Sequence, residues 1–339
     1  MSWVSTLTGR RIVVLGLLLL PFVCFVPWIL VTGPFDFGHK YGILAEFKLQ
    51  TLIDPKTFDG SANQAADAVG QIDLLRTREA ANRLNSLAAT ALLVFVTVGA
   101  GVYGWMVAWR LAAKLGDRGL FVPAAGIAVI LLVLVWPSSY HRIYDLLGKD
   151  VFQSTIGTIY GGMPLAVLDH QQIVNNFVLV IAGVGLAFAA ALIAVLATRL
   201  GYASDLAIYV ELKRYLDRIL IGSALMLAAG VIDLKQWTAL PVPFMGDPDL
   251  AVAYNSFVGG FVALQSICYV AGLVMMFLPA AWLLNNARDR MVHNVQVEQA
   301  AAEVPPGGFA VTDLLRVAAM LAPILVGPVA NFVNLRSAF

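Results

Sequence analysis

Long apolar runs separated by short polar segments organise the chain. Five runs are free of charged residues and long enough to cross a bilayer as α-helices: 12–32, 87–109, 120–140, 173–198 and 256–284. A hydrocarbon core about 30 Å thick requires roughly 20 residues at a rise of about 1.5 Å each. These runs therefore predict five transmembrane helices.

A sixth apolar run, 219–232, is shorter and lies between Arg218 and Asp233. Aromatic and long side chains at its ends can reach the membrane interfaces and extend a short helix. We therefore predict a sixth span over 219–234, with Asp233 at its outer end.

The last apolar stretch, 313–334, is interrupted by Pro323, Gly327 and Pro328. Proline removes a helix hydrogen bond that lipid cannot replace. The stretch is compatible with a kinked or re-entrant seventh helix and with an amphipathic helix lying in the membrane interface, and we favour the amphipathic helix.

The basic residues indicate how the spans are oriented. They are concentrated in segments 1–11, 110–119 and 199–218, whereas the outer loops 141–172 and 235–255 carry more acids than bases. Cytoplasmic loops of membrane proteins keep an excess of Lys and Arg. The sequence thus predicts a cytoplasmic N-terminus, a cytoplasmic linker over 285–312, and a bacterial-type inner membrane as the location.

The largest polar segment, 33–86, falls on the outer side. Its first half is rich in Gly, Pro and aromatic residues, and from Ser61 onward helix-forming residues predominate. No stop signal precedes the second span, so we predict one helix of roughly fifty residues from Ser61 to Trp109, projecting beyond the membrane. Val69, Ile72 and Leu75 form its weak apolar stripe and are the candidate partner contacts.

Composition supports the membrane assignment and excludes several functions. The chain of 339 residues is 60% hydrophobic and 13% charged, and its formal net charge is +1. Soluble domains carry about 25% charged residues, and a neutral chain lacks the basic field that nucleic-acid binding needs. We therefore expect the lipid bilayer, other membrane or envelope proteins, or a second copy as partners, and no nucleic acid.

None of the six apolar runs contains Asp, Glu, Lys, Arg or His. Ionisable groups at membrane depth mark proton relays and ion sites because they are costly to keep there. We therefore expect neither ion-coupled transport nor haem binding within the spans, and no cofactor. Asn175, Asn176 and Gln265 are the main amides near or within the runs, and interhelical hydrogen bonding is their expected role.

Histidines near the outer loops supply the only candidate metal ligands. His141 and Asp145 are four residues apart, and Asp169 adjoins His170. Histidine nitrogen and carboxylate oxygen can bind a metal ion together. The spacings match no known ligand motif, so we interpret these four residues as weak candidates and expect interfacial polar residues instead.

Small residues predict close helix packing. Glycine and alanine allow transmembrane helices to approach closely, because their backbones can touch. The candidate packing positions fall in three spans. They are Gly99, Gly101, Gly104, Gly183, Ala187, Ala191, Gly259 and Ala263.

These patterns predict an all-α polytopic membrane bundle of six transmembrane helices plus the C-terminal seventh helix. We expect a non-enzymatic subunit or scaffold of a multi-protein envelope assembly. A passive channel or facilitator for a small solute is the first alternative, and a membrane enzyme with an outer-face His/Asp metal site is the second.

Overall fold

The computed structural model describes residues 7–23, 62–133, 166–240, 242, 248–294 and 321. Every regular element in these residues is helical, which confirms the predicted all-helical fold. The main helices are α1 (Leu7–Val23), α4 (Ala62–Leu115), a helix over 121–133, α7 (Ala166–Ala197), α8 (Leu206–Thr238) and α9 (Pro248–Asn294). Two short 3-10 turns, η3 (Arg118–Leu120) and η4 (Ala203–Asp205), precede the 121–133 helix and α8.

The protein is a multi-pass membrane protein. Among the described residues, four helices contain segments long and apolar enough to cross a bilayer: Ala80–Leu115, Val174–Ala197, Leu206–Thr238 and Val252–Val292. Arg118–Val133 is a shorter apolar helix. The predicted 33–60 loop lies outside the described residues, as does the 313–334 segment apart from Leu321.

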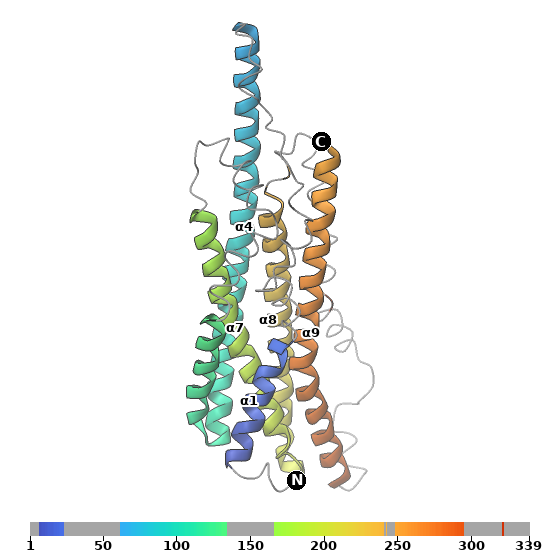
Figure 1. The fold of residues 1–339 in the computed structure, drawn as a ribbon. Helices are drawn as coiled ribbons and strands as arrows, with labels where there is room; N and C mark the ends of the chain where they lie inside the picture. The colour runs from blue at the N-terminus through green and yellow to red at the C-terminus, as the bar shows by residue number, and fades with distance from the viewer. Residues whose placement is uncertain are drawn as a thin grey trace, which may run out of the picture.

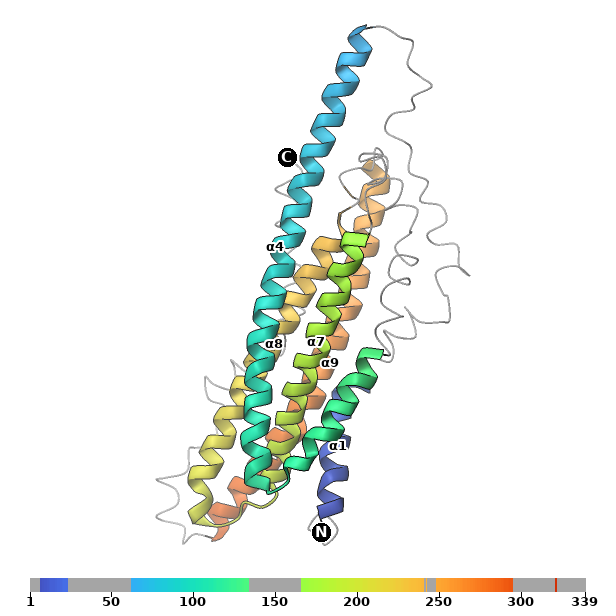
Figure 2. The same cartoon turned by 90° about the vertical axis from the view of Figure 1, so that its left-hand side faces the viewer.

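Helix α4 is one continuous helix of 54 residues without an internal proline. Its N-terminal part extends beyond the other labelled helices (Figures 1 and 2). Helix α4 ends at Gly116, whose φ of 78° is in the left-handed region that favours glycine. The amides of Gly116 and Asp117 donate back to the carbonyls of Ala113 and Ala112, the hydrogen-bond pattern of a Schellman stop.

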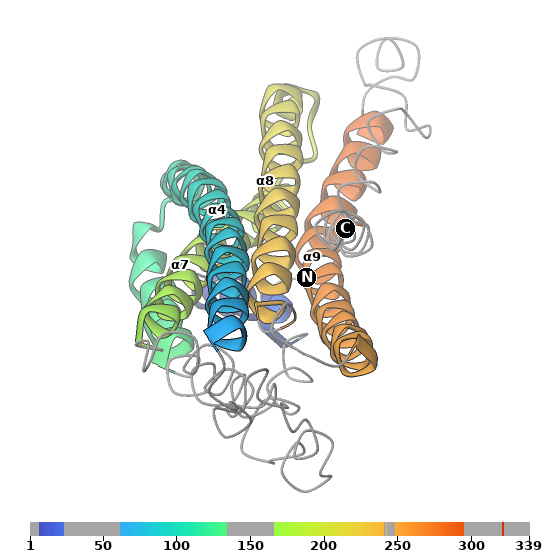
Figure 3. The same ribbon diagram turned by 90° about the horizontal axis from the view of Figure 1, so that it is seen from above.

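Helix α7 is the central helix of the bundle. It contacts α1, α4, α8 and α9, and every residue from Val184 to Ala197 is buried. A helix that is apolar on all sides is stable where neighbours surround it. Viewed from above, α8 lies between α4 and α9 (Figure 3).

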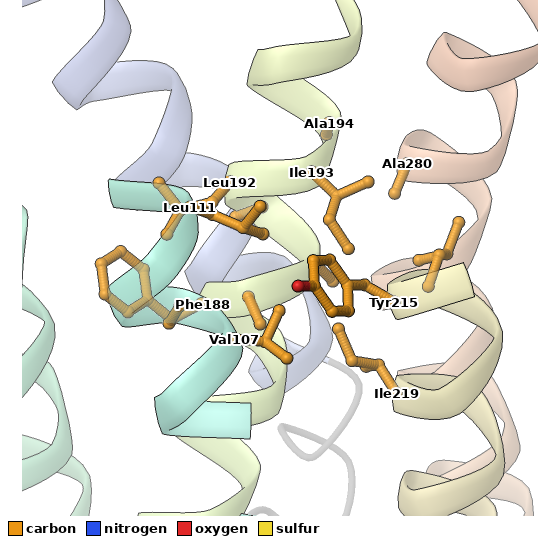
Figure 4. Packing of buried hydrophobic residues seen from close by; sticks show 14 of the residues in the cluster. Val107, Leu111, Phe188, Leu192, Ile193, Ala194, Tyr215, Ile219 and Ala280 are labelled. Atoms are coloured by element: carbon orange, nitrogen blue, oxygen red, sulfur yellow. The ribbon is translucent and has the colours of Figure 1, made fainter. Parts of the chain in front are cut away.

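The apolar core joins α7 to three of its neighbours. Phe188, Leu192 and Ile193 of α7 pack among side chains of α4, α8 and α9 (Figure 4). Val107 and Leu111 come from α4, Tyr215 and Ile219 from α8, and Ala280 from α9.

Contacts among aromatic side chains pack the 121–133 helix against this core. Phe121 lies 5.1 Å from Phe188 and 5.8 Å from Trp105 between ring centroids. The indole nitrogen of Trp105 also donates a 3.1 Å hydrogen bond to the carbonyl of Ile181 on α7. The polar edge of this half-buried tryptophan therefore has a hydrogen-bond partner.

Helix α8 is much longer than the apolar run 219–232 from which this span was predicted. It begins at Leu206 and ends at Thr238, whereas the predicted span was 219–234. The apolar run ends at its flanking charged residues, Arg218 and Asp233. A helix can continue through charged residues when their side chains are paired or hydrogen-bonded. Asp233 and Lys235 are both buried within this helix, at 4% and 5% exposure.

Candidate functional site

The most unusual group in the bundle is the buried carboxylate of Asp233. It lies near the C-terminal end of α8 and faces α4 and α7. Its Oδ1 is 2.6 Å from the hydroxyl of Thr90 on α4, and its Oδ2 accepts a 2.8 Å hydrogen bond from Nδ2 of Asn175 on α7. Three helices far apart in sequence thus meet at one acidic side chain. We call Thr90, Asn175 and Asp233 the polar triad.

Two polar atoms in or next to the triad have no hydrogen-bond partner among the described residues. They are Oδ1 of Asn175 and Oγ of Ser86, and both are buried. Ser86 precedes Thr90 by one turn of α4, and its carbonyl oxygen is 3.0 Å from the Thr90 hydroxyl. Buried polar atoms without partners are rare in proteins, and those that occur call for an explanation.

A tyrosine of α9 completes the surroundings of Asp233. A Cβ at Gly230, one turn before Asp233 on α8, would lie 3.5 Å from the Tyr269 hydroxyl oxygen. Tyr269 in turn accepts a hydrogen bond from the side-chain amide of Gln265. The interior at this level of the bundle is therefore polar and carries one acid.

This arrangement corrects the expectation that the spans hold no ionisable group. Asp233 was placed at the outer end of a short span, but it lies inside the candidate span Leu206–Thr238 and is buried. Burial is possible because Thr90 and Asn175 supply hydrogen bonds that water would otherwise supply.

Basic residues gather at the opposite end of the bundle, where α4 and α7 end and α8 begins. They include Arg11, Lys114, Arg118, Lys213 and Arg290. Several of these basic side chains form ion pairs or hydrogen bonds with neighbouring helices. The Lys114 ammonium pairs with Glu211 across α4 and α8, and Arg290 of α9 donates to the carbonyls of Ala197 and Leu200 at the end of α7.

The best-formed ion pair at this basic end joins Arg11 of α1 to Asp117, in the turn after α4. Both guanidinium nitrogens Nε and Nη2 donate to the carboxylate, at 2.7 and 2.9 Å. The Asp117 side chain is 6% exposed. Hydrogen bonding to Arg11 lowers the pKa of Asp117 below its ordinary value.

Small residues bring α4 and α7 into backbone contact. A Cβ built on Gly104 would lie 2.8 Å from the backbone nitrogen of Leu186, and one on Gly101 would lie 2.8 Å from Cβ of Ala182. Gly99, by contrast, faces open space. Gly185 of α7 lies directly against the Trp105 ring.

The other small residues named from the sequence have different surroundings. Ala187 and Ala191 are buried in the core. Gly183 lies 3.9 Å from the Phe22 ring of α1, measured from an ideal Cβ. Gly259 has no neighbour within 4 Å of such a Cβ, and Ala263 is exposed, so this face of α9 points away from the described bundle.

The remaining sequence candidates fall where side chains are not described. His141 and Asp145 lie outside the described residues, and the side chains of Asp169 and His170 at the start of α7 do as well. The same is true of the side chains of Val69, Ile72 and Leu75 on α4. In the part of the chain that the structure describes, no three His, Cys, Asp or Glu residues are grouped to hold a metal ion.

No protein-family model, no curated protein and no solved structure matches this chain.

Proposed function

We propose that the protein is a non-enzymatic, membrane-embedded subunit or scaffold of a multi-protein envelope assembly. The observation that carries this proposal is the continuous extension of α4 from Ala62 to the start of its candidate span at Ala80. This part of α4 passes beyond the other labelled helices (Figure 1). In proteins most of the stability of a helix comes from tertiary packing and little from intrinsic propensity. A partner on that side would supply the packing.

Photo-crosslinking in cells tests the proposal. A photoreactive residue placed at 69, 72 or 75 on α4 is expected to yield a protein adduct that also co-purifies with the chain in mild detergent. The same residue at Phe95, which is 81% exposed within the candidate span, is the matched control and is expected to contact lipid. A protein of monomeric mass with no adduct at any of the three positions would contradict the proposal.

We further propose that the basic end of the bundle faces the cytoplasm of a bacterial-type inner membrane, which places the N-terminus inside. The support is the gathering of Arg and Lys at one end, the distribution typical of cytoplasmic ends. Single cysteines in a background without Cys24 and Cys268 test this orientation. Thr77 and Tyr202 are both exposed and belong to opposite ends.

In intact cells, an impermeant maleimide is expected to label a cysteine at 77 and to leave one at 202 unlabelled. Permeabilised cells should show labelling at both positions. The reverse pattern in intact cells would invert the topology.

A second candidate function is a channel or facilitator for a small solute. The observation in its favour is the polar triad, because polar groups inside a bundle are the material from which a solute path is built. Flux into liposomes containing the purified protein separates the two candidates, since a scaffold is expected to give none.

A further inference from the structure

Among the described residues, no cation pairs with the buried carboxylate of Asp233, although buried carboxylates usually have one. Its hydrogen-bond partners, Thr90 and Asn175, are both neutral. Moving an ionised carboxylate out of water costs several kcal/mol even after relaxation. Two neutral hydrogen bonds recover only part of that cost. Neutralisation by a proton removes the charge and therefore most of the penalty.

The groups that face Asp233 from each packed helix do not supply a positive charge. Thr90 on α4 and Asn175 on α7 do not titrate in the ordinary pH range. On α9 the nearby titratable group is the Tyr269 hydroxyl, which is neutral at pH 7. Lys235 is buried two residues further along α8 and is not one of the side chains that hydrogen-bond to Asp233.

The hydrogen bonds around Thr90 fit a protonated Asp233 better than an ionised one. The Thr90 hydroxyl lies 2.6 Å from Asp233 Oδ1 and 3.0 Å from the Ser86 carbonyl oxygen, so it has two acceptors within reach. A hydroxyl carries a single hydrogen and can satisfy only one of them. If Asp233 carries a proton on Oδ1, it donates to Thr90, and Thr90 donates to the Ser86 carbonyl. Every contact is then used.

The other carboxyl oxygen argues against a metal cation. Oδ2 of Asp233 accepts from the side-chain amide of Asn175, and a donor NH₂ group would repel a metal ion placed there. A sodium or calcium site instead surrounds the ion with oxygen atoms. A proton needs no such cage.

We propose that Asp233 is a proton-binding site of the membrane bundle, occupied at mildly acidic pH and held by the Thr90 hydroxyl and the Asn175 amide. The proton closes a hydrogen-bond chain across α8, α4 and α7. Its loss leaves a negative charge between three helices. This inference concerns a binding site, and it holds for a scaffold as well as for a solute path.

Infrared spectroscopy of the full-length protein in lipid tests the proposal directly. A protonated carboxyl group has a C=O stretching band that is separate from the bands of carboxylates and amides. We expect this band in the wild-type protein at pH 5.5 and expect Asp233→Asn to remove it. Asp249→Asn, at an exposed position in the first turn of α9, is the matched control and should leave the band unchanged.

A second variant keeps the test decisive if Asp233→Asn fails to fold. Thr90→Val has nearly the same shape but removes the hydroxyl, so the band should shift because the proton of Asp233 loses its acceptor. A wild-type spectrum without the band would overturn the proposal. A band that Thr90→Val and Asp233→Asn both leave unchanged would also overturn it. Disappearance of the band on replacing choline chloride with sodium chloride would assign the site to sodium instead.

Discussion

Helices α4 and α7 meet in two places that are built in opposite ways. Nearer the basic end, Gly101 and Gly104 bring the two backbones into contact, beside the hydrogen bond from the Trp105 indole to the Ile181 carbonyl. Further along the same helices, Thr90 and Asn175 each reach Asp233 of α8 through hydrogen bonds. The first contact rests mainly on close packing of the backbones, and the second depends on hydrogen bonds among three side chains.

The difference shows how one helix pair in lipid can combine a fixed backbone contact with hydrogen bonds that can rearrange. Lipid chains are as apolar as leucine, so helices there associate through close packing and hydrogen bonds, with little hydrophobic drive. The glycine contact has no alternative arrangement at the same density. The polar triad retains unpartnered oxygens on Asn175 and Ser86, so its hydrogen bonds can be redistributed.

The largest expected effect comes from filling the glycine contact. Gly104→Val places branched carbons against the backbone of Leu186 and is expected to destabilise the protein by about 3 kcal/mol or more, the upper range for overpacking. Thermal unfolding in detergent measures the change. Gly99→Val is the control, because its position faces open space, and it is expected to stay within about 0.5 kcal/mol of wild type. Equal losses in the two variants would refute the shape-based account of this contact.

The next effect separates charge from hydrogen bonding in the polar triad. Asp233→Ala leaves the Asn175 amide and the Thr90 hydroxyl without their acceptor and is expected to cost about 1–3 kcal/mol of unfolding free energy. Asp233→Asn restores a donor toward Thr90 and an acceptor toward Asn175, so it should retain most of the stability. Thermal unfolding of both variants provides the measurement. If Asn is as damaging as Ala, the negative charge itself is required.

A smaller, pH-dependent effect is expected from the Arg11 and Asp117 ion pair. The pKa of Asp117 is lower in the folded protein than in the unfolded chain, mainly because Arg11 donates to it. The pair therefore stabilises the fold fully above the ordinary carboxyl pKa of about 4, and this contribution is lost as the pH falls through the lower folded pKa. Asp117→Asn should lower the melting temperature at pH 7, and the gap to wild type should narrow below about pH 4.

Adding Arg11→Gln to Asp117→Asn provides the check on that pair. The double variant should melt close to the single Asp117→Asn variant, since either change breaks the same interaction. A gap to wild type that does not depend on pH would point to packing instead of the ion pair.

The smallest effect is expected from Lys114→Ala. Lys114 and Glu211 form an ion pair whose side chains are 39% and 36% exposed. Exposed pairs contribute about 0.2–1 kcal/mol, and salt screens them. The melting temperature should change little and should converge with wild type at high salt. A loss as large as that of Gly104→Val would reverse the order proposed for the two ends of α4.

The apolar segments could be located from the sequence because every membrane-spanning helix needs roughly 20 predominantly apolar residues. The continuous helix predicted from Ser61 to Trp109 is observed as α4, since no proline or other stop signal interrupts it before Gly116. Helix α8 contains the predicted span 219–234 and extends beyond it at both ends, for a physical reason. A hydropathy run ends at the first charge, but the helix continues where tertiary partners satisfy that charge.

The polar triad was not foreseen, although a signal for it was present. Asn175 lies near the start of its apolar run and Asp233 at the end of its own, while Thr90 follows the start of a third. Alternating helix directions place those three ends at the same level of the membrane. Their pairwise contacts could not be derived, because a sequence does not specify how each helix is rotated about its axis. The same limit applies to the glycines, of which Gly101 and Gly104 face α7 and Gly99 does not.

The unbroken backbone of α4 has a mechanical consequence. A continuous helix is stiff along its length, so a sideways force on its N-terminal part would be carried into the bundle. Thr90 lies on this helix between that part and the contacts that Gly101 and Gly104 make with α7, so the force would act on the hydrogen bond between Thr90 and Asp233.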